Sequence, residues 1–172
     1  MPKLVVLCGH VGCGKTTLRK SVVEKNPQIV SADVYKYIEK YKDQAGRVSD
    51  ENSRKAYEEM YQDLALHDKD TILEIGVKNS EFNFQNFNSL KDKFEVKVIF
   101  CLLDKEVCRQ RVIDRGNKDK SRFINPDSVE EKFKIPFPDE HLKLAQDLQI
   151  SFVDLDMSQP QEDLYLAVAK LF

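Results

Sequence analysis

The chain lacks long apolar runs and a strong excess of either charge. Its longest uninterrupted apolar runs are only five or six residues, far short of the roughly 20 that a helix needs to cross a bilayer, so we expect no membrane span. The formal net charge is −2, which argues against a broad basic surface for nucleic acid but leaves a local patch open. Because the N-terminus enters an apolar segment almost at once, we expect no secretory signal peptide.

The four cysteines lack the spacing of a metal site. Cys8, Cys13, Cys101 and Cys108 form no Cys-x-x-Cys pair, so metal ligation has little support. Cys8 and Cys101 lie in apolar segments, where the usual role is that of a small core residue. Cys13 lies beside Lys15 and ahead of a helix, two features that lower the pKa of a thiol, although we favour a structural role over a redox switch. The set fits a reducing compartment, and we expect a cytoplasmic protein.

What the chain does contain is a regular alternation of strand-like and helix-like segments. With 172 residues, of which 41% are hydrophobic and 33% charged, it is long enough for one globular domain with a substantial core. The alternation predicts an α/β fold in three layers, with a mainly parallel five-stranded sheet between helices. The expected strands are 4–8, 28–32, 71–75, 96–103 and 150–155, and the expected helices are 17–25, 35–41, 51–66, 82–91, 105–115, 126–133, 139–148 and one after Pro160.

One specific motif joins the first expected strand to the first expected helix. Residues 9–16 read G-x-x-x-x-G-K-T, the pattern of a phosphate-binding loop. Glycines let consecutive backbone N–H groups point at phosphate oxygens, and the following helix adds the positive end of its dipole. Lys15 is expected to reach the β- and γ-phosphates, and Thr16 to offer its hydroxyl to Mg²⁺. The predicted nucleotide-binding residues here are Gly9, His10, Val11, Gly12, Cys13, Gly14, Lys15, Thr16 and Thr17.

A carboxylate follows the second expected strand. Asp33 comes directly after the segment 29–32, and the carboxyl ends of strands in an open parallel sheet face the ligand crevice. In that position Asp33 can orient and deprotonate a substrate hydroxyl that attacks the γ-phosphate. It can also cap the helix that begins near Val34. We favour the catalytic interpretation over capping alone.

Two arginines lie four residues apart on the helix after the fourth expected strand. Arg111 and Arg115 precede the most polar stretch of the chain, 116–121, which we expect to be a loop. Paired guanidinium groups can clamp phosphate oxygens, and an arginine plane can stack on adenine. Arg122 lies beyond the stretch and can close onto the nucleotide. A solvated basic helix end is the alternative, and it suits Arg109 and Arg122 better than the pair.

Together these segments resemble the small P-loop kinases. That group includes polynucleotide 5′-kinase domains, gluconate and shikimate kinases, zeta-toxin-like kinases and adenylate-kinase-like enzymes. The resemblance covers nearly the whole chain in element order, and its most specific part is the phosphate-binding loop. Its other parts are Val30-Ser31-Ala32-Asp33, Arg111-Val112-Ile113-Asp114-Arg115, and Glu131-Lys132-Phe133 to Pro136 with Glu140.

The resemblance implies a P-loop NTPase fold that uses ATP and Mg²⁺. It implies a helical substrate region at about 34–68 and an arginine-bearing lid at about 111–136. Asp33 would be the substrate-activating base, Arg111 and Arg115 would serve the lid and the nucleotide, and adenine would lie between Arg111 and residues 156–159. Many relatives end the third strand in an Asp near the metal. Here Glu74 is the candidate to hold a Mg²⁺-bound water, unless this role is absent or moved to Asp33.

The expected function is therefore an ATP- and Mg²⁺-dependent transfer of the γ-phosphoryl group to a small molecule, a nucleoside or nucleotide, or a polynucleotide. The expected catalytic residues are Lys15, Asp33, Arg111 and Arg115, with Thr16 and Glu74 at the metal. The mild acidity of the chain disfavours a polynucleotide. The alternative is a regulatory nucleotide-binding ATPase or GTP-dependent switch without an acceptor. Against GTP, Lys120 stands where the guanine signature N-K-x-D requires Asp.

Overall fold

One parallel sheet organises the chain. The computed structural model describes residues 1–119 and 126–172. Its five strands lie in the order β2-β3-β1-β4-β5, and each neighbouring pair is parallel, so the expected fold class is confirmed. The strands are β1 (Lys3–Cys8), β2 (Val30–Ala32), β3 (Thr71–Ile75), β4 (Glu95–Leu102) and β5 (Ser151–Asp156).

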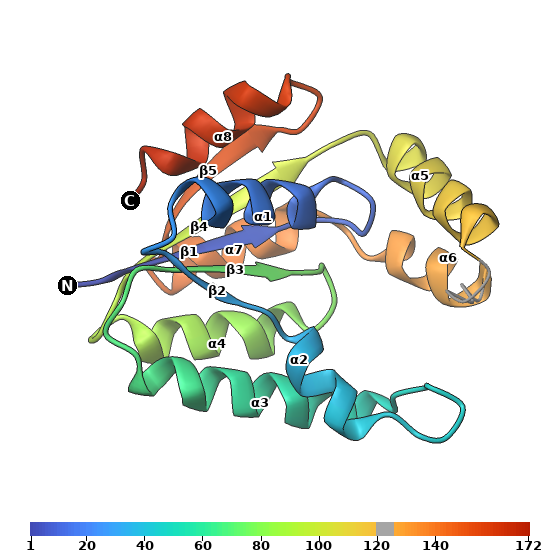
Figure 1. Ribbon diagram of the computed structural model, residues 1–172, viewed down its shortest axis with the longest axis horizontal. Helices are drawn as coiled ribbons and strands as arrows, with labels where there is room; N and C mark the ends of the chain where they lie inside the picture. Colours follow the sequence, from blue (N-terminus) through green and yellow to red (C-terminus); the bar gives the residue numbers. More distant parts are fainter. Residues whose placement is uncertain (120–125) are drawn as a thin grey trace.

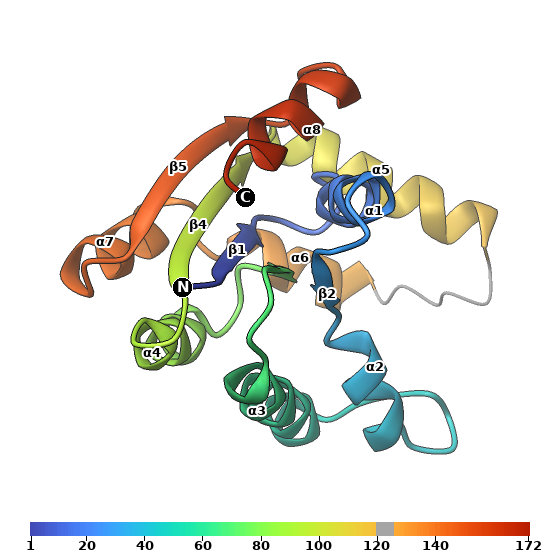
Figure 2. The same cartoon turned by 60° about the vertical axis from the view of Figure 1, so that its left-hand side comes forward.

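Helices connect the strands and cover both faces of the sheet (Figures 1 and 2). The side chains of α3, α4 and α7 form one buried cluster with the sheet, and those of α1, α5, α6 and α8 form another. Within the described residues, no helix is long and apolar enough to cross a membrane. The helices are α1 (Lys15–Lys25), α2 (Tyr35–Ile38), the 3₁₀ turn η1 (Glu39–Tyr41), α3 (Asp50–Leu66), α4 (Ser80–Leu90), α5 (Lys105–Lys118), α6 (Pro126–Lys134), α7 (Asp139–Asp147) and α8 (Gln161–Ala169).

The apolar run of β1 is buried on both sides of the sheet. Leu4 and Val6 belong to the cluster under α3 and α4, whereas Val5 and Leu7 belong to the cluster under α1 and α8. All four are at most 1% exposed. Alternate side chains of a strand point to opposite faces, so a central strand covered by helices on both faces has no polar position. The continuous apolar pattern of this segment has that cause.

Several boundaries differ by one to three residues from those expected, and two of them have a clear local cause. The helix α5 continues to Lys118, so the prediction of a loop from 116 is wrong for residues 116–118. A single Gly116 costs a helix only about 1 kcal/mol, and the backbone N–H of Asp119 still donates to the carbonyl of Arg115 at 3.0 Å. The strand β2 begins at Val30 rather than at 28, because the N–H of Ile29 donates to the carbonyl of Asn26 in a turn after α1.

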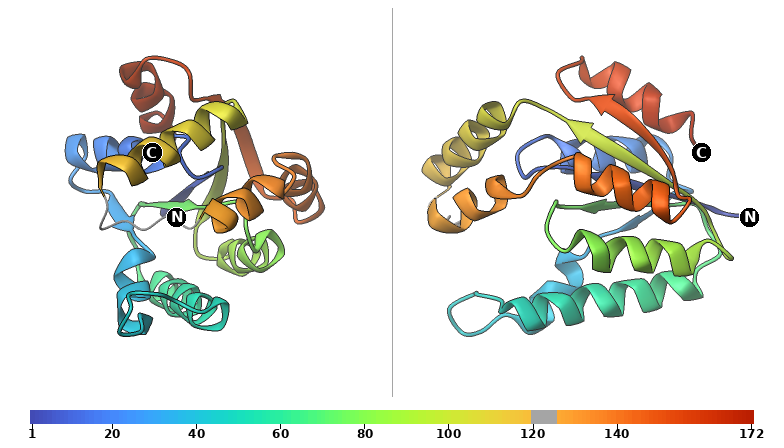
Figure 3. Two further views of the ribbon diagram at one scale, coloured as in Figure 1. Left: turned by 90° about the vertical axis from the view of Figure 1, so that its right-hand side faces the viewer. Right: turned by 180° about the vertical axis from the view of Figure 1, so that it is seen from behind.

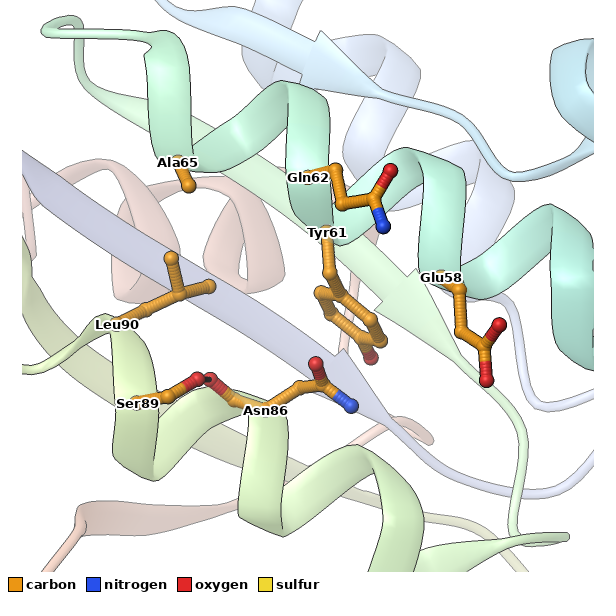
Figure 4. Close-up of a pocket in the computed structure, with 7 residues that line it drawn as sticks. All are labelled: Glu58, Tyr61, Gln62, Ala65, Asn86, Ser89 and Leu90. Carbon is orange, nitrogen blue, oxygen red and sulfur yellow. Dashed lines mark hydrogen bonds between the residues drawn. The ribbon is translucent and has the colours of Figure 1, made fainter.

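The carboxyl ends of the strands open onto one edge of the sheet. Cys8 at the end of β1 lies opposite Ile75 of β3 and Phe100 of β4. The loops that follow these strands therefore meet at this edge, and α2, α5 and α6 gather around it (Figure 3). A different concave surface, between α3 and α4, is lined by Glu58, Tyr61, Gln62, Ala65, Asn86, Ser89 and Leu90 (Figure 4). It lies on the helical layer and not at the carboxyl edge.

Candidate active site

The loop between β1 and α1 is pressed against β4 and α5. A Cβ atom on Gly9 would lie 2.7 Å from the carbonyl oxygen of Cys101, and one on Gly12 would lie 2.5 Å from that of Cys108. Both approaches are too close for any side chain. Gly12 and Gly14 also have positive φ angles of 85° and 103°, which glycine adopts without strain. These glycines are therefore required by the curvature and the close packing of the loop.

Lys15 points into the curve of this loop. Its Nζ donates to the carbonyl oxygen of Gly9 at 2.7 Å and to that of His10 at 2.9 Å. The ammonium group is thus held by neutral acceptors at the beginning of α1, where the helix dipole also favours an anion. A phosphate oxygen can take the place of these carbonyls with a gain in electrostatic energy. The arrangement suits the triphosphate contact that the motif predicts.

The side chain of His10 connects the loop to the region of α6. It is 5% exposed, and its ring centroid lies 5.2 Å from that of Phe133 and 5.5 Å from that of Phe137. Burial, aided by the positive charges of Lys105 and Lys15, lowers the pKa of His10 to about 4, so the ring is neutral near pH 7. The imidazole therefore packs against the rings of Phe133 and Phe137.

The two predicted metal residues lie in contact. The hydroxyl of Thr16 donates to Oε1 of Glu74 at 2.8 Å, and Glu74 is 7% exposed on β3. Its other oxygen, Oε2, has no hydrogen-bond partner among the described residues. A buried carboxylate oxygen without a hydrogen bond is costly, and a hard cation with oxygen ligands would satisfy it. Thr16 and Glu74 therefore fit a Mg²⁺ ion.

No larger set of metal ligands accompanies this pair. Across residues 1–119 and 126–172, no three or more His, Cys, Asp or Glu side chains are grouped so that they could hold an ion. Magnesium commonly keeps several waters and binds through one or two protein groups and the phosphates of its substrate. A Mg²⁺ ion at Thr16 and Glu74 would accordingly depend on the triphosphate for the rest of its coordination.

Asp33 is engaged through both carboxylate oxygens. Its Oδ1 accepts the backbone N–H of Tyr35 at 3.0 Å, so the helix-capping role that the sequence left open is realised. Its Oδ2 lies 3.4 Å from Nη2 of Arg19. The side chain is 24% exposed and lies at the carboxyl edge one residue beyond β2. The capping contact uses only one oxygen, and the other is paired with Arg19.

The arginines of α5 differ in what they contact. Arg111 is exposed, and its Nη1 donates to the carbonyl oxygen of Gly12 at 3.3 Å. Arg115 is exposed one turn further along the helix. Arg109 instead joins α5 to α6, because its Nε lies 2.8 Å from Oε1 of Glu130 and its guanidinium lies 5.4 Å from the ring centroid of Phe133. The expected Arg122 contact falls outside the described residues.

The segment expected to flank adenine lies beside the loop. The N–H of Met157 donates to the carbonyl of Leu102 at 2.8 Å, just after β5. The methyl group of Met157 lies 3.4 Å from the place of a Cβ atom on Gly14. The region between α5 and residues 156–159 is thus adjacent to the phosphate-binding loop.

A known family model matches most of the chain. Residues 4–137 match the family model described as an AAA domain, AAA_33. The chain belongs to the AAA domain family. The matched residues contain the phosphate-binding loop, Asp33, Glu74 and α5. The expected relationship to the small P-loop kinases is confirmed. A search of curated proteins found no match.

Solved structures share the fold of this AAA domain along nearly its full length. A protein provisionally described as a kinase, from Chloroflexus aurantiacus, superposes with a TM-score of 0.70 at 16% identity, covering 99% of this chain and 98% of that chain. Shikimate kinase from Acinetobacter baumannii in complex with shikimate gives 0.63 at 18%, with 99% and 93% covered. A gluconokinase from Sinorhizobium meliloti gives 0.59 at 12%, with 98% and 90% covered. At these identities the likeness shows a shared P-loop kinase fold.

One residue of the AAA domain site was missed by the sequence analysis. Arg19 is 4% exposed on α1, and it lies within 3.4 Å of carboxylate oxygens of both Asp33 and Glu74. A signal was present, because Arg19 follows Thr16 by three residues and so lies on the same side of the helix. It was missed because a charged side chain is usually exposed.

The cysteines lie around the same loop. All four are free and buried, which confirms the core role expected for Cys8 and Cys101. Burial raises the pKa of Cys8 to about 12. A hydrogen bond from Cys101 lowers the pKa of the Cys13 thiol to about 6 against the opposing effect of burial, and the positive charge of Lys15 adds to the lowering. Cys13 is only 1% exposed, so its role in the AAA domain is one of packing.

Proposed function

We propose that this chain is a kinase that transfers the γ-phosphoryl group of ATP, with Mg²⁺, to an acceptor bearing a hydroxyl or a phosphate. The observation that carries the proposal is the convergence of Lys15, the Thr16–Glu74 pair and Asp33 at one edge of the sheet. Phosphoryl transfer needs positioning and charge neutralisation more than covalent chemistry. A phosphate cradle with an internal lysine, next to carboxylates, supplies both.

Each residue has a distinct part in this proposal. The backbone N–H groups of the loop and Nζ of Lys15 bind the phosphates. Thr16 and Glu74 would hold Mg²⁺, which when bound neutralises charge that develops between the β- and γ-phosphates. Asp33 orients the acceptor hydroxyl through Oδ2 and accepts its proton. The helix-capping contact of Oδ1 fixes the carboxylate plane for this task.

The nucleotide side of the site is assigned to α5 and its continuation. Arg111 already lies against the loop through Gly12, and Arg115 follows on the same helix. We assign 111–136, including Arg122, to a lid over the nucleotide and 34–68 to the region that binds the acceptor. Shikimate kinase and gluconokinase, which share the fold, support a small hydroxylated acceptor over a polynucleotide, in keeping with the net charge of −2.

A second candidate function is a regulatory nucleotide-binding ATPase without an acceptor. It is favoured by the engagement of both oxygens of Asp33, one in a helix cap and one beside Arg19, since a purely structural Asp33 would look the same. The two functions differ in what receives the γ-phosphoryl group. Water would be the only recipient in the regulatory protein.

The test is an acceptor screen with ATP labelled at the γ-phosphate. The panel contains nucleosides, nucleoside monophosphates, sugars, sugar acids and short oligonucleotides, and Lys15→Ala is the matched inactive protein. A kinase transfers the label to one class of acceptor and does so only with Lys15 present. Release of labelled phosphate at a slow rate that no acceptor raises would instead identify the regulatory ATPase.

A further inference from the structure

Arg19 is surrounded by three side chains, one from β2, one from the residue after β2 and one from β3. Its Nη2 lies 3.4 Å from Oδ2 of Asp33, and its Nε lies 3.4 Å from Oε2 of Glu74. Its Nη1 donates a hydrogen bond to the hydroxyl of Ser31 on β2. The side chain is 5% exposed. Separate nitrogens of one buried guanidinium group thus face the acceptor-side carboxylate, the metal-side carboxylate and a strand hydroxyl.

The register of the sheet explains why a cation is needed there. Ala32 of β2 lies opposite Leu73 of β3, so the next residues along the two parallel strands, Asp33 and Glu74, come level with each other. Two like charges on neighbouring strands repel each other, and burial of Glu74, which is 7% exposed, weakens the screening of that repulsion by solvent. Arg19 lies within ion-pair distance of both. The cluster of one cation and two carboxylates keeps a net negative charge next to Thr16.

The geometry is not that of a cluster optimised for stability alone. Nε of Arg19 and Oε2 of Glu74 are within ion-pair distance, yet neither has a hydrogen-bond partner among the described residues. Buried charged groups with unmet hydrogen bonds are costly, and apolar residues of similar volume often stabilise a protein more. The loose contact to Oε2 leaves that oxygen available to a ligand.

We propose that Arg19 is a positioning residue that holds Asp33 and Glu74 in fixed relative places, so that Mg²⁺ and the acceptor meet the same phosphoryl group. This role rests on the proposed kinase function. It depends on the planar fork of the guanidinium group, which offers several donors in fixed directions. A lysine at this position keeps the charge but presents a single ammonium group, and it cannot hold the three partners at once.

The experiment measures how much Mg²⁺ tightens binding of a non-hydrolysable ATP analogue, by calorimetry with and without the ion. The variants are Arg19→Lys and, as a control that removes charge from the exposed side of the same helix, Lys20→Met. Loss of a residue that orients metal-binding groups typically costs 10–100-fold in metal affinity. Arg19→Lys should therefore bind the analogue alone as the wild type does, but lose about tenfold or more of the Mg²⁺ effect. Lys20→Met should keep the full effect.

Folding is followed in parallel by thermal denaturation. The positioning role of Arg19 is overturned if the Arg19→Lys protein folds and keeps the wild-type Mg²⁺ effect. Should this variant fail to fold, Ser31→Ala carries the test, because it removes only the hydroxyl that holds Nη1; a smaller loss of the Mg²⁺ effect supports the proposal and an unchanged effect overturns it. Failure of the wild type to bind the analogue at all contradicts the kinase function itself, and this role falls with it.

Discussion

Charged side chains lie on two sides of the phosphate-binding loop, and the two groups differ in burial. On the carboxylate side, Arg19 is 4% and Glu74 is 7% exposed, and Asp33 lies within 3.4 Å of Arg19. On the arginine side, Arg111 and Arg115 are exposed, and Arg111 donates a hydrogen bond to the carbonyl of Gly12 at 3.3 Å.

The difference indicates when each side is assembled. The carboxylate side is held by strands and by α1, so folding alone fixes its geometry. An exposed arginine side chain keeps most of its rotamer freedom, and ordering it costs up to about 2 kcal/mol. We therefore expect the arginines to become fully ordered when a phosphate binds them. The predictions below test this division, from the largest expected effect to the smallest.

Lys15 lies where the two sides meet, and its loss should have the largest effect. Lys15→Ala removes the one cation held inside the curve of the loop, so we expect weak ATP binding and no detectable transfer. The side chain contacts loop carbonyls rather than the core, and the fold should survive. The measurements are analogue titration, ATP turnover and melting temperature, with Lys20→Ala as the control on the same helix. Normal turnover by folded Lys15→Ala protein would refute the site.

Asp33→Asn tests the carboxylate side. The amide keeps an oxygen for the N–H of Tyr35 but cannot accept a proton, and removal of a general base typically costs about 10²–10⁴ in rate. We expect near-normal ATP binding with transfer lowered in that range. The control is Asp70→Asn, whose carboxylate accepts the backbone N–H of Lys3 at 2.8 Å, at the amino ends of β1 and β3 and away from the site. A drop in melting temperature with little change in transfer would mean that Asp33 serves only as a cap.

Arg111→Ala and Arg115→Ala test the arginine side. A hydrogen bond to a charged group is worth about 1.5–3 kcal/mol, so each loss should lower kcat by roughly 10–100-fold, with a smaller effect on ATP affinity. Exposed side chains should leave the melting temperature unchanged. Arg109→Ala, which removes the contacts to Glu130 and Phe133, should instead lower the melting temperature and leave kcat nearly unchanged. Equal effects of all three substitutions on stability would contradict the assignment.

His10 links the loop to the region of α6 and gives a pH-dependent effect on stability. Its pKa in the fold is about 4, against 6.5 for the free side chain. Between these values the unfolded chain binds a proton that the folded protein does not, so stability is highest above about pH 6.5 and falls as the pH is lowered. From pH 7.5 to 5.5 the contribution is about 1–2 kcal/mol.

Denaturant unfolding at the two pH values measures this contribution. His10→Asn should reduce the loss of stability between pH 7.5 and 5.5 by that amount, whereas His67→Asn, at an exposed position, should not. Because the comparison is between pH values within one variant, any packing change caused by the substitution cancels. An identical pH dependence in wild type and His10→Asn would show that folding does not lower the pKa of His10.

Local sequence was enough to predict the elements and the loop. The strand β3 has the bounds expected from its apolar run, because Thr71–Ile75 is a central strand buried throughout. The motif of the loop was equally readable, since Gly12 and Gly14 adopt positive φ angles that glycine allows without strain. The loop expected from Gly116 was wrong for residues 116–118, because one glycine weakens a helix without ending it.

Arg19 could not be placed from the sequence, because its role depends on contacts between distant segments. Asp33 and Glu74 are separated from it by 14 and 55 residues in the chain. Only the order β2-β3-β1 and the packing of α1 bring these three side chains together. The contacts of Asp33 could be predicted only in part. Helix capping is a local contact that the sequence predicts, but the ion pair with Arg19 is not.

The division of the site into two sides is tested most directly by amide hydrogen exchange with and without a Mg²⁺-bound ATP analogue. The account predicts that β3 and residues 18–25 of α1 are protected in the free protein and change little on binding, whereas residues 105–118 of α5 and 129–134 of α6 gain clear protection. The contrary result is strong new protection in β3 and α1 with none in α5 and α6. It would mean that the carboxylate side, and not the arginine side, is assembled by the nucleotide.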